Sequence, residues 1–255
     1  MKVWTVANQK GGVGKTTTTV TLGGILAQQK NRVLLIDTDP HASLSYYFGI
    51  DSEALTKSTY DIFVQSGPID RDSVLDCLCP TKLDTLFVLP ATMNLATLDR
   101  KLGAKSGMGL VLTKALKAVE LEFDYVLIDC PPVLGVLMVN ALAACDKIIV
   151  PVQTEFLALK GLDRMMHTLE IMSKSLRKVF NALIVPTMFD KRVNAALEAQ
   201  QSLRKDYGES TWKSNIPVDT RFREASQAQT PISLFAPKSR GAYAYNKLLT
   251  YLEAH

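Results

Sequence analysis

The sequence is poor in the residues that hold metals or cross-link a chain. It has four cysteines in 255 residues, Cys77, Cys79, Cys130 and Cys145, and three scattered histidines. A single residue separates Cys77 from Cys79, so no pair shows the spacing of a zinc site, and a chain of this length needs no disulfide framework. We therefore expect reduced cysteines that are buried in the core.

The sequence also lacks a segment that would cross a membrane. Its first residues, MKVWTVANQ, contain no basic and then apolar signal segment. The most apolar region, residues 126–152, is interrupted by Asp129, by Pro131-Pro132 and by Asp146-Lys147, so it does not form an unbroken span. The net charge of +4 is mild and permits a polyanionic partner without requiring one. We expect a soluble, cytoplasmic protein.

Short apolar runs are abundant, and they alternate with helical patterns. The runs are rich in Val, Ile and Leu on both faces, which is typical of strands buried on both sides of a parallel sheet. The pattern predicts an α/β fold with a doubly wound, mostly parallel sheet and helices on both faces. The predicted strands are residues 2–7, 32–37, 85–90, 125–129, 147–151 and 180–187. The predicted helices are residues 16–29, 94–102, 109–119, 136–144, 155–175, 194–207 and 240–253.

Between the second and third predicted strands, residues 49–84 are the least periodic part of the chain. We expect short helices and loops there. No internal repeat, low-complexity tract or linker divides the sequence, so we expect residues 1–255 to form a single domain.

The stretch NQKGGVGKTTTT, Asn8–Thr19, follows the pattern of a phosphate-binding loop with one departure. The standard loop reads G-x-x-x-x-G-K-[ST], and its first glycine position is occupied here by Gln9. An additional lysine, Lys10, comes next. The loop lies between the first predicted strand and the first predicted helix, which is the context that phosphate binding needs.

The glycines of this loop allow the backbone N–H groups to approach phosphate oxygens, and the helix N-terminus adds partial positive charge. Lys15 is expected to reach the β- and γ-phosphates, and the Thr16 hydroxyl to bind Mg²⁺. The predicted nucleotide-binding residues of the loop are Gly11, Gly12, Val13, Gly14, Lys15, Thr16 and Thr17.

Three aspartates stand at the carboxyl ends of predicted strands, where ligands collect in α/β sheets: Asp37 and Asp39 in VLLIDTDP, and Asp129 in YVLIDCPP. Asp129 follows four apolar residues in the manner of a Walker B acid, which holds Mg²⁺, usually through water. We expect Asp39 to orient or activate the attacking water. Asp37 is either a further acid of the site or the cap of a helix or turn. The predicted metal-binding residues are Thr16, Asp37, Asp39 and Asp129.

Four motifs together resemble the deviant-Walker ATPases of the ParA/MinD family. They are KGGVGKTT (10–17), LLIDTDPH (34–41), LIDCPP (127–132) and TEFLALKGL (154–162). The tail GAYAYNKLLTYL (241–252) is similar to the closing helix of that family, so the resemblance covers essentially the whole chain. It implies ATP and Mg²⁺ as cofactors, and slow, partner-stimulated hydrolysis of ATP to ADP and phosphate.

The resemblance also gives a role to the additional lysine. In this family, the lysine that matches Lys10 crosses a dimer interface and touches the phosphates bound by the other subunit. The resemblance therefore implies a homodimer that forms with ATP and separates with ADP, with Lys10, Lys15 and Asp39 as the catalytic residues. It also implies that Met188 and Pro217 flank the base. The chain departs from the common string D-x-D-P-Q at His41, which is either a tolerated variation or a change in how this loop senses the γ-phosphate.

The branches of this family differ in what they bind. The chain begins at its first strand without a helix-turn-helix, and its tail lacks a basic amphipathic helix, so neither operator DNA nor a membrane is expected as partner. Non-specific binding to nucleoid DNA is expected instead. Arg192 and Arg221 match the arginines that contact DNA in the family, whereas another usual arginine is replaced by Val218. Lys191 and Arg223 are further candidates for DNA binding.

The favoured function is a positioning ATPase that binds the nucleoid and is stimulated by a cargo-bound protein. A chemotaxis protein array is the favoured cargo, with localisation at the nucleoid, at the cell pole or at both, and plasmid or chromosome partition is the alternative. Three other classes stay open. They are a MinD-like membrane ATPase, an iron–sulfur reductase on the same fold, and a tyrosine kinase suggested by Tyr243, Tyr245 and Tyr251.

Overall fold

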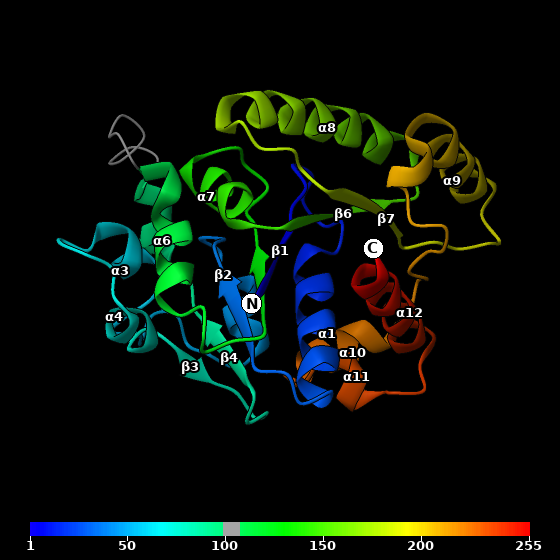
Figure 1. Ribbon diagram of the computed structural model, residues 1–255. Helices are drawn as coiled ribbons and strands as arrows, with labels where there is room; N and C mark the ends of the chain where they lie inside the picture. The colour runs from blue at the N-terminus through cyan, green and yellow to red at the C-terminus, as the bar shows by residue number, and fades with distance from the viewer. Residues whose placement is uncertain (99–107) are drawn as a thin grey trace.

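The computed structural model describes residues 1–98 and 108–255, and its centre is one seven-stranded sheet with the order β3-β4-β2-β5-β1-β6-β7 (Figure 1). The pairs among β4, β2, β5, β1, β6 and β7 are all parallel, and β3 alone is antiparallel to its neighbour β4. The strands are β1 (Lys2–Val6), β2 (Val33–Asp37), β3 (Cys79–Pro80), β4 (Leu86–Leu89), β5 (Tyr125–Asp129), β6 (Lys147–Gln153) and β7 (Ala182–Thr187).

Helices cover both faces of this sheet. They are α1 (Lys15–Gln28), α2 (Ser43–Tyr47), α3 (Thr59–Val64), α4 (Arg71–Leu75), α6 (Val111–Ala118), α7 (Val136–Ala144), α8 (Phe156–Leu176), α9 (Asn194–Tyr207), α10 (Arg221–Gln227), α11 (Ile232–Phe235) and α12 (Arg240–Ala254). Short 3₁₀ turns are η1 (Met93–Thr97), η2 (Met108–Leu110) and η3 (Gly208–Ser210).

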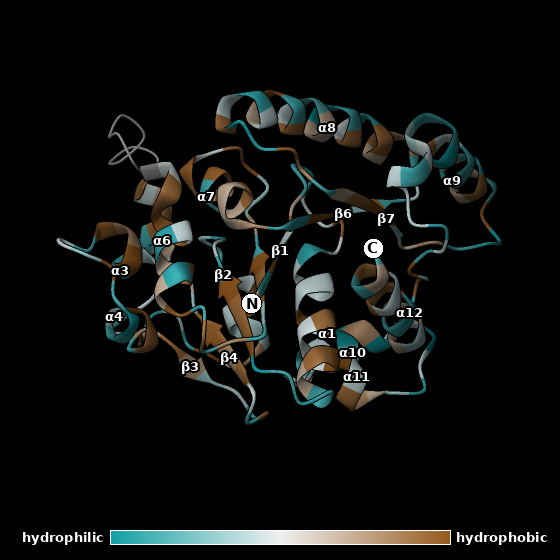
Figure 2. Ribbon diagram, viewed as in Figure 1, coloured by the Kyte–Doolittle hydropathy of each residue, from teal (hydrophilic) through white to brown (hydrophobic). Residues whose placement is uncertain are grey.

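The alternation of side chains along each strand explains why the strands are apolar throughout. On β2, Leu34 and Ile36 belong to the core that contains residues of α3, α6, α7 and α8. Their neighbours Val33 and Leu35 belong to the second core, which contains residues of α1 and α12. Figure 2 accordingly shows the strands as hydrophobic ribbons between helices of mixed character. A strand buried on both faces has no solvent-facing positions for polar residues, so the doubly wound fold is confirmed.

The predicted elements are mostly confirmed. The strands agree within two residues at each end, and two predicted helices, 136–144 and 194–207, match α7 and α9. The prediction of one helix over 109–119 was wrong at its start, where η2 precedes α6. The prediction of a helix over 94–102 was wrong over its first part, which is the 3₁₀ turn η1, and residues 99–107 lie outside the described part of the chain. Four short elements, α2, β3, α10 and α11, were not predicted.

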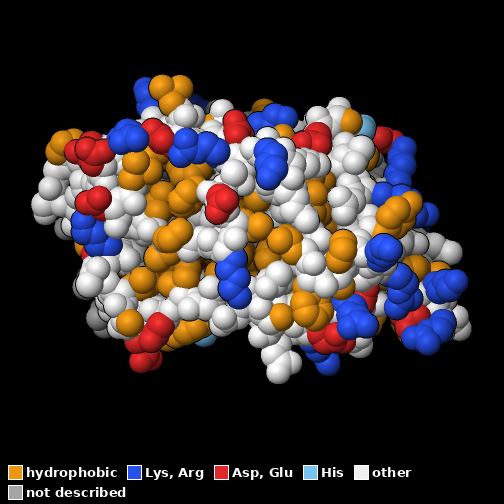
Figure 3. Space-filling view, turned by 90° about the horizontal axis from the view of Figure 1, so that it is seen from below, with side chains coloured by type: hydrophobic (Ala, Val, Ile, Leu, Met, Phe, Trp, Pro, Cys, Tyr) orange, Lys and Arg blue, Asp and Glu red, His pale blue; other side chains and the backbone are white. Residues whose placement is uncertain are grey.

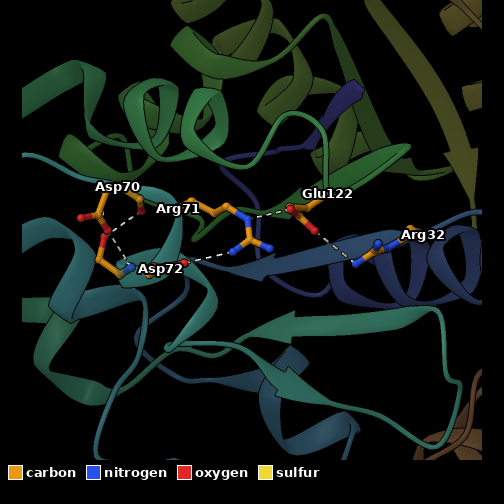
Figure 4. A network of polar contacts seen from close by, with 6 residues as sticks. Arg32, Asp70, Arg71, Asp72 and Glu122 are labelled. Atoms are coloured by element: carbon orange, nitrogen blue, oxygen red, sulfur yellow. Dashed lines mark hydrogen bonds and ion pairs between the residues drawn. The ribbon is translucent and has the colours of Figure 1, made fainter.

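The segment 49–84 consists of short helices and loops, as its weak periodicity indicates, together with the two-residue strand β3. A surface network fixes its α4 against the sheet (Figure 4). Glu122, just before β5, accepts hydrogen bonds from Arg71 Nε of α4 at 2.7 Å and from Arg32 Nη2, just before β2, at 3.4 Å. Exposed ion pairs contribute about 0–1 kcal/mol each, so this network orients α4 more than it stabilises the fold.

Candidate nucleotide-binding site

The loop between β1 and α1 forms an open cradle. Gly12 and Gly14 have φ angles of +75° and +94°, in the left-handed region that favours glycine. A Cβ atom added at Gly11, Gly12 or Gly14 would find no heavy atom within 4 Å, so open space lies above the loop. Gly14 is the N-cap of α1, and no side chain caps this end of the helix. The free N–H groups of α1 and its dipole therefore suit an anion.

The neighbouring strands hold this loop in place. Asn8 at its start is buried and donates from Nδ2 to the carbonyl of Pro151 on β6 at 2.8 Å. Val13 near its end accepts a hydrogen bond from Thr187 Oγ1 of β7 at 2.9 Å. The loop therefore keeps its open shape through hydrogen bonds to β6 and β7, in addition to its own glycines.

Lys15 and Thr16 open α1 and point into the acidic part of the site. Lys15 is buried, and its Nζ donates to the carbonyl of Lys10 at 3.1 Å. Burial lowers the pKa of Lys15 from its ordinary value, and the nearby Asp129 carboxylate opposes this shift. Thr16 Oγ1 donates to Asp129 Oδ2 at 2.6 Å. Thr17 lies half-buried in the same turn of the helix.

Two of the predicted aspartates lie side by side on neighbouring strands of the sheet. Asp37 on β2 is in register with Asp129 on β5, and both are buried. Burial is the main cause that raises the pKa of Asp37 to about 6 and that of Asp129 to about 8, and the Asp37 charge raises the latter further. Asp129 Oδ1 is buried and, among the described residues, has no hydrogen-bond partner. A metal-bound water would satisfy this oxygen.

Asp37 has a different environment. Its Oδ2 accepts hydrogen bonds from the backbone N–H and the hydroxyl of Ser45 on α2, at 2.9 and 2.8 Å, and its Oδ1 accepts one from the backbone N–H of Asp39 at 3.1 Å. These are the contacts of a turn-capping acid, which was the alternative to a metal role. Within 1–98 and 108–255 no group of three His, Cys, Asp or Glu side chains could hold a metal ion. The Mg²⁺ role of Asp37 thus stays a prediction.

Asp39 lies just beyond β2, at the edge of this cluster. Its side chain is 16% exposed, and its charge acts on both Lys15 and Asp129. Its Oδ1 accepts hydrogen bonds from the backbone and the ring of His41. The structure therefore brings Lys15, Thr16, Asp39 and Asp129 together, as the sequence predicts.

Lys10 has a position unlike that of Lys15. Its side chain is partly exposed and forms an ion pair with Glu155, which immediately precedes α8. Its ammonium therefore binds a carboxylate outside the cluster of Asp37, Asp39 and Asp129. The sequence contains Glu155 within the motif TEFLALKGL, but no role was predicted for it.

Met188 and Pro217 flank the far side of the loop. Gln153 Nε2 donates to the carbonyl of Gly12 at 3.4 Å and contacts Met188 Sδ at 2.9 Å. Met188 has a left-handed φ of +53°, and the next residue, Phe189, forms an isolated β-bridge with Pro217. The two predicted base-flanking residues therefore lie near each other, beside the end of β7. Thr187 and Gln153, which link this region to the loop, were missed because single polar residues at strand ends carry no distinctive pattern.

The predicted DNA-binding residues lie in or beside one hollow of the surface. Figure 3 shows Lys and Arg side chains clustered toward the right of the face seen from below. A hollow of about 510 Å³ is lined by Lys191, Arg192 and Arg240, together with Asp190 and Asp219. The Arg192 guanidinium binds Asp190, and this hydrogen bond is the main cause that lowers the pKa of Asp190 to about 2.

Arg221 and Arg223 lie on α10 beside this hollow, and both are exposed. Arg221 forms an ion pair with Glu224 one turn along the helix. Arg192 and Arg221 are thus each paired with an acid of their own chain. Contact with DNA phosphates would have to replace or share these pairs.

Several described residues bear on the other classes. Cys130 and Cys145 are buried in the core, so neither thiol faces a surface that a second subunit could share. Tyr245 is buried within α12 and forms a hydrogen bond with Thr18 of α1 at 2.8 Å, whereas Tyr243 is exposed. Where the chain is described, no helix has both the length and the apolar character of a membrane span.

These features define a P-loop NTPase: a mostly parallel sheet, an open phosphate loop and the buried Asp129, which is in register with Asp37. The family profile described as "AAA domain" matches residues 1–182. The sporulation initiation inhibitor protein Soj of Bacillus subtilis is 38% identical over 255 residues, covering 100% of this chain and 99% of Soj. The chromosome partitioning protein ParA of Caulobacter vibrioides is 38% identical over 251 residues, covering 97% of this chain and 92% of that protein.

A solved structure with the same architecture is that of cobyrinic acid a,c-diamide synthase from Mycobacterium smegmatis with bound ADP and magnesium. Its TM-score is 0.85 at 31% identity, with coverage of 100% of this chain and 94% of that chain. The chain described here belongs to the ParA/MinD family of P-loop ATPases, as its similarity to Soj and ParA over nearly its whole length shows.

Proposed function

We propose that the chain is a partition ATPase whose two copies associate around bound ATP, with Lys10 reaching the nucleotide of the partner subunit. The observation that carries this proposal is the division of labour between two lysines of one loop. Lys15 is buried and directed at the site of its own chain, whereas Lys10 is partly exposed and engaged by Glu155. An exposed lysine held by a single exchangeable ion pair suits a group that acts on a second copy.

The residues of the site fit ATP and Mg²⁺. The cradle above the glycines is open, and the buried Oδ1 of Asp129 needs a partner. Thr16 Oγ1 and Asp129, the latter through water, would hold Mg²⁺, with phosphate oxygens and water completing its coordination. When bound, Mg²⁺ supplies positive charge to the β- and γ-phosphate oxygens.

The roles of the protein groups follow from their positions. Lys15 would neutralise charge on the phosphates, and the first N–H groups of α1 would hold the phosphate oxygens. Asp39, with one carboxylate oxygen free of protein donors in the described chain, would orient the attacking water. Hydrolysis would then release the γ-phosphate that Lys10 of the partner subunit contacts. The two copies would separate as a result.

The basic face around the hollow is proposed to bind DNA without sequence preference when two copies are together. Arg192, Arg221, Arg223 and Lys191 lie on this face, and a dimer would double the number of phosphate contacts. One of the named relatives is a chromosome partitioning protein, which favours a chromosome or plasmid as cargo. A chemotaxis array, a stimulating cargo protein and placement at the nucleoid or pole stay predictions from the sequence.

The test uses Lys15→Gln, with Lys114→Gln on the exposed side of α6 as the matched control. ATP binding is measured by fluorescence of a labelled analogue, and hydrolysis by phosphate release. We expect Lys15→Gln to lose both activities and Lys114→Gln to keep them. Normal ATP binding by Lys15→Gln would refute the assignment of this loop.

A further inference from the structure

In the turn after β2, the side chain of His41 contacts the carboxylate of Asp39. Asp39 accepts two hydrogen bonds at one carboxylate oxygen, Oδ1. One comes from the backbone N–H of His41 at 3.0 Å, and the other joins Oδ1 to the imidazole Nδ1 at 2.9 Å. Because an ionised carboxylate only accepts hydrogen bonds, the Nδ1 atom is the donor. Over residues 1–98 and 108–255 we find no hydrogen bond to the other oxygen, Oδ2.

The backbone of this turn holds the imidazole in place. Pro40 has a fixed φ, and the N–H of Ala42 donates to the carbonyl of Asp39 at 2.8 Å, which closes the turn. Ala42 is buried, adopts a left-handed φ of +53° and leads directly into α2. Ser45 of α2 is in turn hydrogen-bonded to Asp37. With both ends of the turn anchored, His41 loses little conformational freedom when it binds Asp39.

The side chain of His41 lies nearer the solvent than that of Asp39. The His41 side chain is 76% exposed, whereas that of Asp39 is 16% exposed. The charge of Asp39 acts on Lys15, Asp37 and Asp129, so this carboxylate belongs to the nucleotide site. The imidazole lies on the outer side of the carboxylate and touches no other residue of the site in the hydrogen bonds of the described chain.

We propose that His41 is a positioning residue for ATP hydrolysis, which fixes the Asp39 carboxylate through Oδ1 so that Oδ2 is presented to the attacking water. This role rests on the proposed function, because it requires Asp39 to orient that water. The side chain of His41 acts only through Asp39 and contacts no reacting atom. A carboxylate held at one oxygen by two donors has one favoured orientation, whereas a carboxylate held by the backbone alone can rotate about its side-chain bonds.

The test compares three variants, together with Asp39→Asn as the reference for loss of the water-orienting carboxylate, with the wild type in ATP hydrolysis at saturating ATP. For His41→Ala we expect kcat to fall about tenfold, which corresponds to about 1.4 kcal/mol of transition-state stabilisation, with nucleotide affinity unchanged. His41→Asn should restore most of kcat, because its amide Nδ2 takes the place of the imidazole Nδ1. His167→Ala is the matched control, since His167 is an exposed histidine 4.0 Å from Glu170 on α8.

The outcomes separate this inference from the proposed function. If the wild type neither binds nor hydrolyses ATP, the proposed function is wrong. If the wild type hydrolyses ATP, Asp39→Asn does not and His41→Ala equals the wild type, the positioning role alone is wrong. The role is equally wrong if His41→Asn is as slow as His41→Ala while both lower the melting temperature, because His41 would then only stabilise the turn. Rescue by asparagine with unchanged nucleotide affinity supports the inference.

Discussion

Replacing Asp129 by asparagine should make the nucleotide-free protein more stable at pH 8 while removing its activity. Asp129 and Asp37 lie side by side at the ends of neighbouring strands. Their pKa values are raised to about 8 and about 6, mainly by burial. In the unfolded chain an aspartate has a pKa of about 3.9. Between about pH 4 and pH 8 the folded state therefore keeps protons that the unfolded state has released. The free energy of unfolding must fall as the pH rises through this window.

The size of this effect follows from the two shifts. One proton held only by the folded state changes the free energy of unfolding by about 1.4 kcal/mol for each pH unit. From pH 5 to pH 8 Asp129 holds such a proton over about three units, which corresponds to about 4 kcal/mol. Asp37 does so over about one unit, from pH 5 to pH 6, which adds about 1.4 kcal/mol. The wild type should therefore be less stable at pH 8 than at pH 5 by up to about 5 kcal/mol.

The assay is urea unfolding at pH 5, 6, 7 and 8, with EDTA present and nucleotide absent. Asp129→Asn should lose most of this pH dependence and exceed the wild type at pH 8 by about 3–4 kcal/mol, because the amide carries no charge to bury. Asp84→Asn, in the exposed turn before β4, is the matched control and should follow the wild type. A wild-type stability that stays level or rises from pH 5 to pH 8 would show that burial does not raise the pKa values of these aspartates, as would an unchanged slope in Asp129→Asn.

Two further predictions concern the DNA-binding face and the packing of α12. Arg192→Ala and Arg221→Ala should each weaken DNA binding by the ATP-bound protein and lower the slope of log K against log salt by about one unit, as measured by fluorescence anisotropy at several salt concentrations. An unchanged slope would exclude that arginine from phosphate contact. Gly241→Ala would place a Cβ 2.5 Å from Phe222 Cζ, and urea unfolding should show a loss of about 1–2 kcal/mol. Adding Phe222→Leu should restore part of this loss, and no recovery would mean that the ring is not the obstacle.

The parts of the fold that sequence predicts are those with a strong local cause. β5 and α7 have continuous apolar or periodic patterns, and both were predicted at their observed bounds. The short elements α2, β3, α10 and α11 were not predicted. α11 has only four residues, too few to show a helical period, and its position depends on packing against α1 and α10.

The candidate site shows the same division. The glycines, Lys15, Thr16 and Asp129 belong to contiguous motifs whose chemistry is readable from their spacing. Glu155 and Thr187, which hold Lys10 and the loop, come from distant parts of the chain, and only the folded sheet brings them close. The turn-capping contacts of Asp37 likewise depend on α2, an element that begins six residues later.

Lys10 is proposed to act on the nucleotide of a second copy. This role is tested most directly by light scattering coupled to size-exclusion chromatography, with Mg²⁺ and a non-hydrolysable ATP analogue. The wild type should elute as a dimer, and Lys10→Ala should elute as a monomer that still binds the analogue. A wild type that stays monomeric when saturated with the analogue, or a Lys10→Ala variant that dimerises as the wild type does, would exclude this role of Lys10.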